Sequence, residues 1–268
     1  MSPKHSKSKS KRTIVLVGGI DGSNWLSIAS IIYFYFMLMT DSAGMELRRK
    51  YDWVLMPVAN PDGYQYTKIN RKWQKNVCPD GAKDGCEATY LDANFNYQWG
   101  VLRRSEEFDP GYPKYPGKFG SSAVETRSIQ SMINNLNKNG QILALFNVNG
   151  FGRKWIIPFG DGKSAANIQR QQQVSDTTRT YMVHRIKSKG NNLRKWDIGK
   201  SFDFGDLQKT TGSLEDWVLG TTEIPYAFKV SLGNEWNPFD TPTKDIQVSG
   251  EELYQGIVGS VVAMRAGF

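Results

Sequence analysis

The sequence contains very little histidine and cysteine, the side chains that most often hold zinc in proteins. Of its 268 residues, two are histidines and two are cysteines. His5 lies in a basic opening stretch and His184 in a polar helical pattern, so neither is near Cys78 or Cys86. The two cysteines therefore indicate neither a structural zinc site nor a thiol nucleophile. The segment between them contains proline and glycine, so Cys78 and Cys86 can form a small disulfide loop.

The sequence also lacks an apolar run long enough to cross a membrane. Its most apolar stretch, residues 25–39, is shorter than the ~20 residues that a spanning helix needs. We therefore expect a buried helix there and no membrane partner. The basic N-terminus leads directly into a short apolar run at residues 13–17, and no secretory signal is visible in it.

Charge is unevenly distributed along the chain. The formal net charge is +8, and much of this excess comes from the lysines and arginine of residues 4–12. A segment of this composition cannot bury enough apolar surface to fold, so we expect residues 1–12 to be a disordered basic tail. Nucleic acid is not an expected partner, although salt-sensitive binding through this tail remains an alternative. The composition, 39% hydrophobic and 22% charged, suits one globular domain over residues 13–268.

Short apolar runs alternate with helical patterns, which predicts an α/β domain with a mostly parallel sheet. Two capping-box patterns, Ser122-Ala123-Val124-Glu125 and Ser249-Gly250-Glu251-Glu252, predict helix starts. The dipeptides Asn60-Pro61 and Asp62-Gly63 predict a loop at the carboxyl edge of the sheet. The predicted strands are 13–17, 53–58, 142–148, 155–158 and 226–232, and the predicted helices are 25 to about 49, 122–136, 165 to about 189 and one near the C-terminus.

Three segments resemble a strongly marked pattern of the pancreatic-type metallocarboxypeptidases of the A/B type, in the zinc carboxypeptidase family. They read Asn60-Pro61-Asp62-Gly63-Tyr64, Asn70-Arg71-Lys72-Trp73 and Asp92-Ala93-Asn94-Phe95-Asn96. The resemblance implies a single-domain zinc-carboxypeptidase-like fold, with a mixed, mostly parallel twisted sheet and helices on both faces. The family usually places further strands ahead of residue 13, so we expect the first edge strands to be lacking here.

The resemblance implies a zinc ion held by two histidines and one glutamate. Segment 19–27 matches the first part of that site, and Asp21 and Asn24 stand where the family has a histidine and the glutamate. Asn149 stands at the second histidine. From these replacements we expect no zinc cofactor. An alternative is that the oxygens of Asp21, Asn24 and Asn149 hold calcium or magnesium.

The positions that act on substrate in the family are also replaced. Ser231 stands at the general base and Gln74 at the arginine that stabilises the oxyanion. Lys229 shares a strand face with Ser231, and a serine–lysine hydrolase is therefore a further alternative.

Substrate binding is affected in the same way. The family's asparagine–arginine pair that holds the terminal carboxylate is matched by Asn94 and Phe95, and its mobile tyrosine falls near Gln208. Glu215 stands at the residue that lines the side-chain pocket, where an acidic group suits basic side chains, or it faces solvent.

We therefore expect a pseudoenzyme, a catalytically inactive metallocarboxypeptidase homologue that serves as a binding or structural component of an assembly. Strand 53–58 should lie at an exposed sheet edge and pair with a protein partner or in a homo-oligomer. The alternatives are a peptidase or hydrolase with a non-standard site, and an anionic-surface binder acting through the basic tail.

Overall fold

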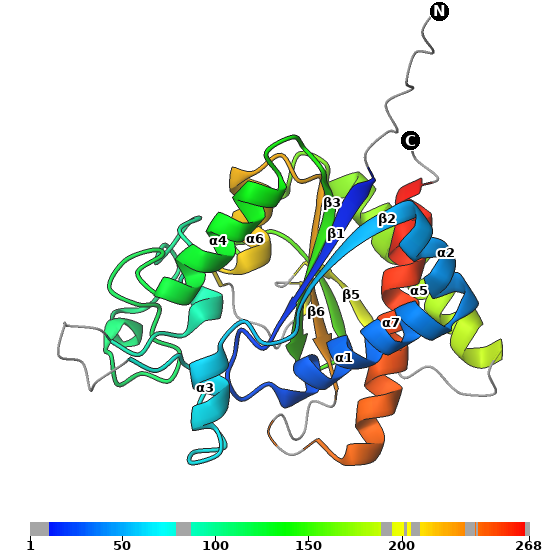
Figure 1. Cartoon of the computed structure of the whole chain (residues 1–268). Coiled ribbons are helices and arrows are strands. Elements are labelled where there is room, and N and C mark those ends of the chain that lie inside the picture. Colours follow the sequence, from blue (N-terminus) through cyan, green and yellow to red (C-terminus); the bar gives the residue numbers. More distant parts are fainter. Residues whose placement is uncertain are drawn as a thin grey trace, which may run out of the picture.

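The computed structural model describes residues 11–78, 87–188, 195–200, 203–204, 210–233, 239 and 241–265, and contains one six-stranded sheet between two layers of helices (Figure 1). The strands are β1 (Arg12–Gly18), β2 (Tyr51–Met56), β3 (Ile142–Gly150), β4 (Lys154–Ile157), β5 (Asp197–Lys200) and β6 (Tyr226–Leu232). The helices are α1 (Trp25–Thr40), α2 (Ser42–Lys50), α3 (Pro61–Tyr66), α4 (Val124–Leu136), α5 (Ile168–Ser188), α6 (Leu214–Thr221) and α7 (Thr243–Arg265), with 3-10 turns η2 (Leu91–Ala93) and η3 (Ser105–Phe108).

The sheet has the order β2-β1-β3-β6-β4-β5. β1 runs parallel to β2 and β3, β3 runs parallel to β6, and β4 runs parallel to β5, whereas β4 and β6 are antiparallel. Parallel neighbours need crossover connections, and the helices provide them. The expected fold class, a mixed and mostly parallel α/β sheet with helices on both faces, is confirmed.

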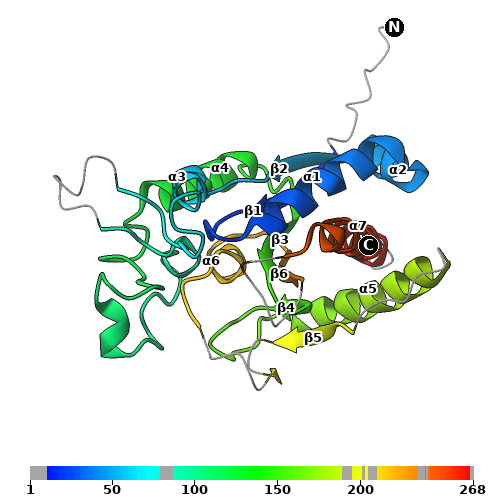
Figure 2. The same cartoon turned by 90° about the horizontal axis from the view of Figure 1, so that it is seen from below.

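Each face of the sheet carries its own apolar core. Along β1, Ile14 and Leu16 belong to one core, while Val15 and Val17 belong to the other, as the alternation of side chains along a strand requires. Seen along the sheet, α1, α2, α5 and α7 cover one face, and α3, α4 and α6 lie on the other side (Figure 2). Because both faces are covered, β1 and β3 are almost entirely buried and are apolar along most of their length.

The predicted helix from residue 25 to about 49 is wrong as a single element. It is two helices, α1 and α2, bent by 89° at Asp41. The Asp41 side chain accepts a hydrogen bond from the Ala43 backbone N–H at 3.1 Å, which caps the N-terminus of α2, and another from the Tyr254 hydroxyl at 2.6 Å. In the described part of the chain no single helix passes a length and hydropathy test for a membrane span, although α1 and α2 pass it as a bent pair.

The helix predicted over 122–136 is present as α4, but neither predicted capping box is formed. α4 begins at Val124, and the side chains of the first box are used in tertiary contacts: Ser122 Oγ accepts from Asn94, and Glu125 accepts from Asn76. The second box lies inside α7, which begins at Thr243. The five predicted strands agree with β1, β2, β3, β4 and β6 within a few residues. Arg12, which the sequence analysis placed in the tail, is the first residue of β1.

The expected loop after β2 contains the short helix α3, which is N-capped by Asn60. Asn60 is completely buried, and its side-chain oxygen accepts from the Gly63 N–H at 3.0 Å. Its amide group donates to the carbonyls of Ile20 at 3.1 Å and Lys75 at 3.2 Å. One side chain therefore joins the loop after β1, the loop after β2 and the segment that follows α3.

We predict that Asn60→Ala lowers the free energy of unfolding by about 2–4 kcal/mol, because it removes a helix cap and leaves two buried carbonyls without their donor. Chemical denaturation measures this change. Gln65→Ala, an exposed substitution within the same helix, is the matched control and should change stability by less than about 0.5 kcal/mol. Equal effects of the two substitutions would contradict the role assigned to Asn60.

Candidate functional site

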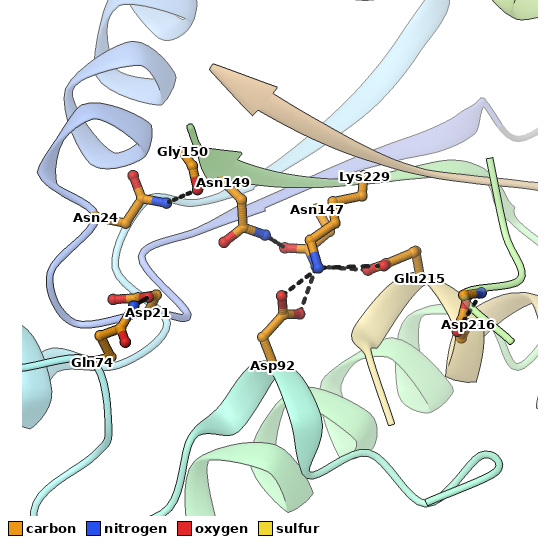
Figure 3. A network of polar contacts seen from close by, with 11 residues as sticks. Asp21, Asn24, Gln74, Asp92, Asn147, Asn149, Gly150, Glu215, Asp216 and Lys229 are labelled. Carbon is orange, nitrogen blue, oxygen red and sulfur yellow. Dashed lines mark hydrogen bonds and ion pairs between the residues drawn. The ribbon is translucent and has the colours of Figure 1, made fainter. Parts of the chain in front are cut away.

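The candidate site lies at the carboxyl ends of β3 and β6, where η2 and α6 approach the sheet (Figure 3). Ligand sites of open α/β sheets gather at this edge. Polar side chains interrupt the apolar strands here: Asn147 and Asn149 on β3, and Lys229 and Ser231 on β6. Asn147 pairs with Lys229 and Asn149 with Ser231 in the strand register, so the four residues are close neighbours.

The Lys229 ammonium group lies between two buried carboxylates. It is 2.5 Å from Asp92 Oδ2, on η2, and 3.6 Å from Glu215 Oε1, on α6. The Asp92 and Glu215 side chains are only 2% and 5% exposed, and that of Lys229 is 19% exposed. Residues from three separate elements thus form one ion cluster. The reading of Glu215 as a solvent-facing residue is wrong.

Asn147 contacts the same two carboxylates as Lys229. Its side-chain Nδ2 donates to Asp92 Oδ1 at 2.9 Å and to Glu215 Oε2 at 2.7 Å. Its own oxygen accepts from the Asn149 amide at 2.8 Å. All four carboxylate oxygens of Asp92 and Glu215 are therefore engaged by Lys229 or Asn147, which is the condition for keeping buried charges stable.

The electrostatics of the cluster keep the lysine charged. Burial alone lowers the pKa of Lys229, but the neighbouring Asp92 and Glu215 carboxylates outweigh it, and the net shift of the pKa is upward. Lys229 is consequently a cation and not a base.

The next carboxyl along α6, Asp216, has its pKa raised by burial and by the charge of Glu215. It accepts hydrogen bonds from the Gly160 N–H at 3.0 and 3.2 Å.

Asp21 lies in the loop after β1 and has a separate set of partners. Oδ1 accepts from the Ser23 N–H at 2.8 Å and the Ser23 hydroxyl at 2.6 Å, and Oδ2 accepts from Gln74 Nε2 at 2.8 Å. Burial raises the pKa of Asp21 to about 6, although these hydrogen bonds oppose the shift. Figure 3 shows the Asp21–Gln74 pair apart from the Lys229 cluster.

The close approach of two backbones holds the Asp21 loop in place. The Gly22 N–H donates to the Gln74 carbonyl at 3.1 Å. A Cβ atom at Gly22 would lie 2.7 Å from the carbonyl carbon of Gly63, so only glycine fits. This packing places Gln74 against Asp21.

The three residues predicted at the metal-ligand positions do not share partners. Asn24 is the N-cap of α1, accepts from the Ser27 N–H at 3.3 Å and donates to the Gly150 carbonyl at 3.4 Å. Asn149 bonds to Asn147, and Asp21 bonds to Ser23 and Gln74. The proposed oxygen cage for calcium or magnesium is therefore not assembled by these contacts.

The other predicted site residues have mainly structural surroundings. Asn94 is completely buried and donates to the carbonyls of Pro116 and Phe119 at 2.7 and 3.0 Å. Phe95 is also completely buried, and its ring lies 6.0 Å from that of Trp217 in the second core. Phe95 thus belongs to the core, where a charged carboxylate clamp would be costly.

Two of the predicted features fall partly outside the described residues. Gln208 lies outside them, and so does Cys86. Cys78 is disulfide-bonded, and its pairing with Cys86 stays a prediction. Ser231 is buried on β6 beside Asn149, while the Lys229 ammonium bonds to the Asp92 carboxylate and is not engaged with Ser231 as a serine–lysine pair would require.

Sequence reasoning missed Asp92 and Asn147, and it considered Lys229 only as a neighbour of Ser231 in an alternative hydrolase site. Asn147 could have been noticed as a polar residue in the apolar run of β3, on the same strand face as Asn149. Asp92 lies within one of the quoted segments, yet nothing in its local pattern points to Lys229, 137 residues away.

Comparisons with known proteins give a consistent assignment. A family model described as zinc carboxypeptidase matches residues 1–256. The chain is 27% identical to a zinc carboxypeptidase of Simulium vittatum over 95% of this chain and 82% of that protein. It is 24% identical to an inactive metallocarboxypeptidase of Arthroderma gypseum over 92% of this chain but 45% of that protein.

The fold comparison agrees. The structure of bovine thrombin-activatable fibrinolysis inhibitor in complex with tick carboxypeptidase inhibitor matches 96% of this chain and 84% of that chain, with a TM-score of 0.84 and 22% identity. At this identity the likeness shows the fold. The zinc-carboxypeptidase-like architecture expected from the sequence is confirmed.

The expectation of no zinc cofactor is contradicted by these matches. The matching family is one of zinc carboxypeptidases, and the Simulium relative carries zinc in its name. Replacement of three ligand positions in one sequence was too little ground for setting the family's cofactor aside.

Whether the residues of this chain fit zinc is a question of donor chemistry. Zinc sites in proteins use imidazole, thiolate and carboxylate ligands. Within the described ranges, no three His, Cys, Asp or Glu side chains are grouped so that they could hold a metal ion. Asp21 offers one carboxylate whose oxygens already accept from Ser23 and Gln74. This donor set does not fit zinc, and we assign no chemical step to the ion.

We predict that Lys229→Met lowers the free energy of unfolding by about 3–5 kcal/mol, because it leaves two buried carboxylates without their cation. In the double variant Lys229→Met/Asp92→Asn, the second substitution should cost less than Asp92→Asn does in the unmodified protein. Chemical denaturation of the four proteins gives the coupling energy.

Lys163→Met is the matched control, since Lys163 is 69% exposed and lies 3.4 Å from Asp161. It should change stability by less than about 1 kcal/mol. Additive effects in the double-variant cycle would show that Lys229 and Asp92 do not interact.

A pH prediction follows from Asp21, whose pKa is raised from 3.8 to about 6 in the folded protein. As the pH rises through this interval, the unfolded chain loses its proton first, so Asp21 opposes folding above pH ~6 and is neutral in effect below pH ~4. Asp21→Asn cannot ionise. Its stability relative to the unmodified protein should therefore increase by about 2–3 kcal/mol between pH ~4 and pH ~7.

Thermal or chemical unfolding at several pH values measures this difference. Asp62→Asn, an exposed change at the start of α3, should show no such trend. Parallel pH profiles for Asp21→Asn and the unmodified protein would contradict the raised pKa of Asp21.

Proposed function

The chain belongs to the zinc carboxypeptidase family, and we propose that it is a catalytically inactive member that acts as a binding or structural component of an assembly. The observation that carries the proposal is the buried cluster of Lys229, Asp92, Glu215 and Asn147, in which the polar groups at the candidate site bind one another. A catalytic site instead presents polar groups to a substrate.

The groups that could act on a peptide bond are engaged or unsuited. A general base must be able to take up a proton near neutral pH. Lys229 has its pKa raised by Asp92 and Glu215 and is already protonated. The Gln74 amide, at the position of the oxyanion arginine, donates to Asp21 instead of facing an open site. These contacts argue against a hydrolase built on Ser231.

The position that would bind the terminal carboxylate of a peptide has no charged side chain. Where the resemblance places a carboxylate clamp, Phe95 is packed against Trp217 in the core, and a phenyl ring cannot replace a bidentate guanidinium. At the position of the side-chain pocket, Glu215 is occupied by Lys229, a residue of the chain itself. A basic substrate side chain would have to displace an internal ammonium from two buried carboxylates.

The framework around the site is nevertheless intact. Asn60 and Asn94 are fully buried and hold several backbone segments together through their amides. A well-packed framework with an internally paired site suits a scaffold protein. The similarity to a relative named as an inactive metallocarboxypeptidase supports this proposal, while the similarity to relatives named as zinc carboxypeptidases makes the activity assay essential.

The test is release of carboxy-terminal residues from peptides ending in lysine, arginine or phenylalanine, measured by mass spectrometry. We expect no release above background with the protein alone, with added zinc or with chelator, because the base, oxyanion and carboxylate-binding groups are not available. An active carboxypeptidase on the same peptides is the positive control. Release that zinc restores after chelation would refute the proposal.

A further inference from the structure

A pocket lies between the first half of α1 and the start of α7, outside the candidate site. Its volume is about 510 Å³, which is within the range of ~300–1,000 Å³ typical of small-molecule sites. The described residues that line it include no member of the Lys229 cluster and none of the replaced site positions. An inference about this pocket therefore goes beyond the proposed loss of activity.

One wall of the pocket is a face of α1. Trp25, Ala29 and Ile32 line it, and their spacing of four and three residues places them on one side of the helix. At 1.5 Å per residue, this wall is roughly 10 Å long. Trp25 and Ile32 are 40% and 56% exposed, so a ligand can reach the wall from solvent.

The apolar end of the pocket is held by the packing of α1 on α7 (Figure 1). Tyr33, next to Ile32, donates a hydrogen bond to Glu251 at 3.1 Å. A Cβ atom at Gly250 would lie 2.6 Å from the Tyr33 ring, so the two helices are in close contact there. Ile246, which lines the pocket, lies one turn before Gly250. Two packed helices thus form this end of the pocket.

The other end of the pocket, at Trp25, is aromatic and carries a guanidinium group. Arg71 lies over the Trp25 ring, 4.2 Å from its centre, and the Tyr64 ring meets the same indole edge-on with 5.8 Å between centroids. Arg71 also donates to the Ser23 carbonyl at 2.7 Å, which holds the guanidinium at this end.

Charge at the pocket has one sign. Arg71 is the one charged side chain among the described lining residues. A second cation lies close by, since the Lys72 ammonium is 5.8 Å from the centre of the Phe239 ring, and Phe239 also lines the pocket. Cations at one end and aliphatic side chains at the other suit a ligand with an anionic head and an apolar chain.

We propose that this pocket binds a straight-chain carboxylate, with its head group near Arg71 and Lys72 and its hydrocarbon chain along α1 towards Ile32 and Ile246. A guanidinium group matches a carboxylate in charge and in hydrogen-bond geometry. A peptide of similar size would place backbone N–H and C=O groups against the aliphatic wall, and burying them without partners is costly. A hydrocarbon chain has no such groups.

Isothermal titration calorimetry of the full chain with decanoate tests the proposal. We expect saturable binding at one site per chain. Decylammonium, which has the same chain and the opposite charge, should bind at least about ten-fold more weakly, because Arg71 and Lys72 repel it. Equal affinities for the two ligands, or decanoate binding that does not saturate, overturn the proposal.

Two variants locate the bound chain. Ile32→Glu places a carboxylate on the wall, and Ala29→Trp fills the pocket, so each should weaken decanoate binding at least about ten-fold. Phe36→Glu is the matched control, because Phe36 is 57% exposed on the same helix and does not line the pocket. Chemical denaturation shows whether each variant is folded, and Ile32→Glu, at an exposed position, carries the test if Ala29→Trp is not. Equal effects of Ile32→Glu and Phe36→Glu would place the ligand elsewhere and refute the site.

A peptide ligand is tested in the same titration. The tripeptide Ala-Leu-Phe has a terminal carboxylate and apolar side chains, and it should bind more weakly than decanoate because of its backbone amides. Tighter binding of the tripeptide overturns the assignment of a hydrocarbon chain. These titrations measure binding and the peptidase assay measures release of residues, so failure of this proposal and failure of the inactive-site proposal are distinguishable.

Discussion

A single ammonium group, that of Lys229, joins three segments that are far apart in the sequence. It binds Asp92 on η2 and Glu215 on α6 from its place on β6. Removing these charges from water is costly, and the cluster is stable because Asn147 supplies the remaining hydrogen bonds to both carboxylates. Because the carboxylate oxygens of the cluster already have partners within the chain, few of them remain to bind a substrate. The same contacts therefore explain both the stability of the cluster and the proposed lack of activity.

Around that cluster, buried amides hold the loops at the carboxyl edge of the sheet. Asn60 bridges the segments that follow β1 and β2, and Asn94 holds the carbonyls of Pro116 and Phe119. Both residues belong to the segments that carried the family resemblance. Their contacts are with the backbone of this chain, so their presence is explained by folding alone. This accounts for a strong family pattern around a site without the expected donors.

Local patterns predicted the sheet better than the helix ends. Apolar runs located β1, β3 and β6, because interior strands of a covered parallel sheet are mostly apolar. Helix starts were missed where a side chain that suits a cap served a tertiary contact instead, as Ser122 does with Asn94. Asp41 is the reverse case, because its capping role was not predicted. It caps α2 inside a long apolar pattern and so divides the one expected helix into two.

The inference of a protein without zinc shows the limit of reading one site from one sequence. The replaced positions were visible as residue types, but the family to which the chain belongs is defined by zinc enzymes. Donor chemistry at Asp21, Asn24 and Asn149 does not fit the ion, and this follows from the contacts of these side chains and not from their identities alone.

The sequence by itself determined the α/β fold, the positions of its interior strands, and the scarcity of histidine. These follow from residue type and from the period of side chains along a strand, which are local properties. Only the tertiary structure decided that Lys229 meets Asp92 and Glu215 and that Phe95 lies in the core. Such contacts depend on how distant segments pack, and no local pattern specifies the partner of a side chain 137 residues away.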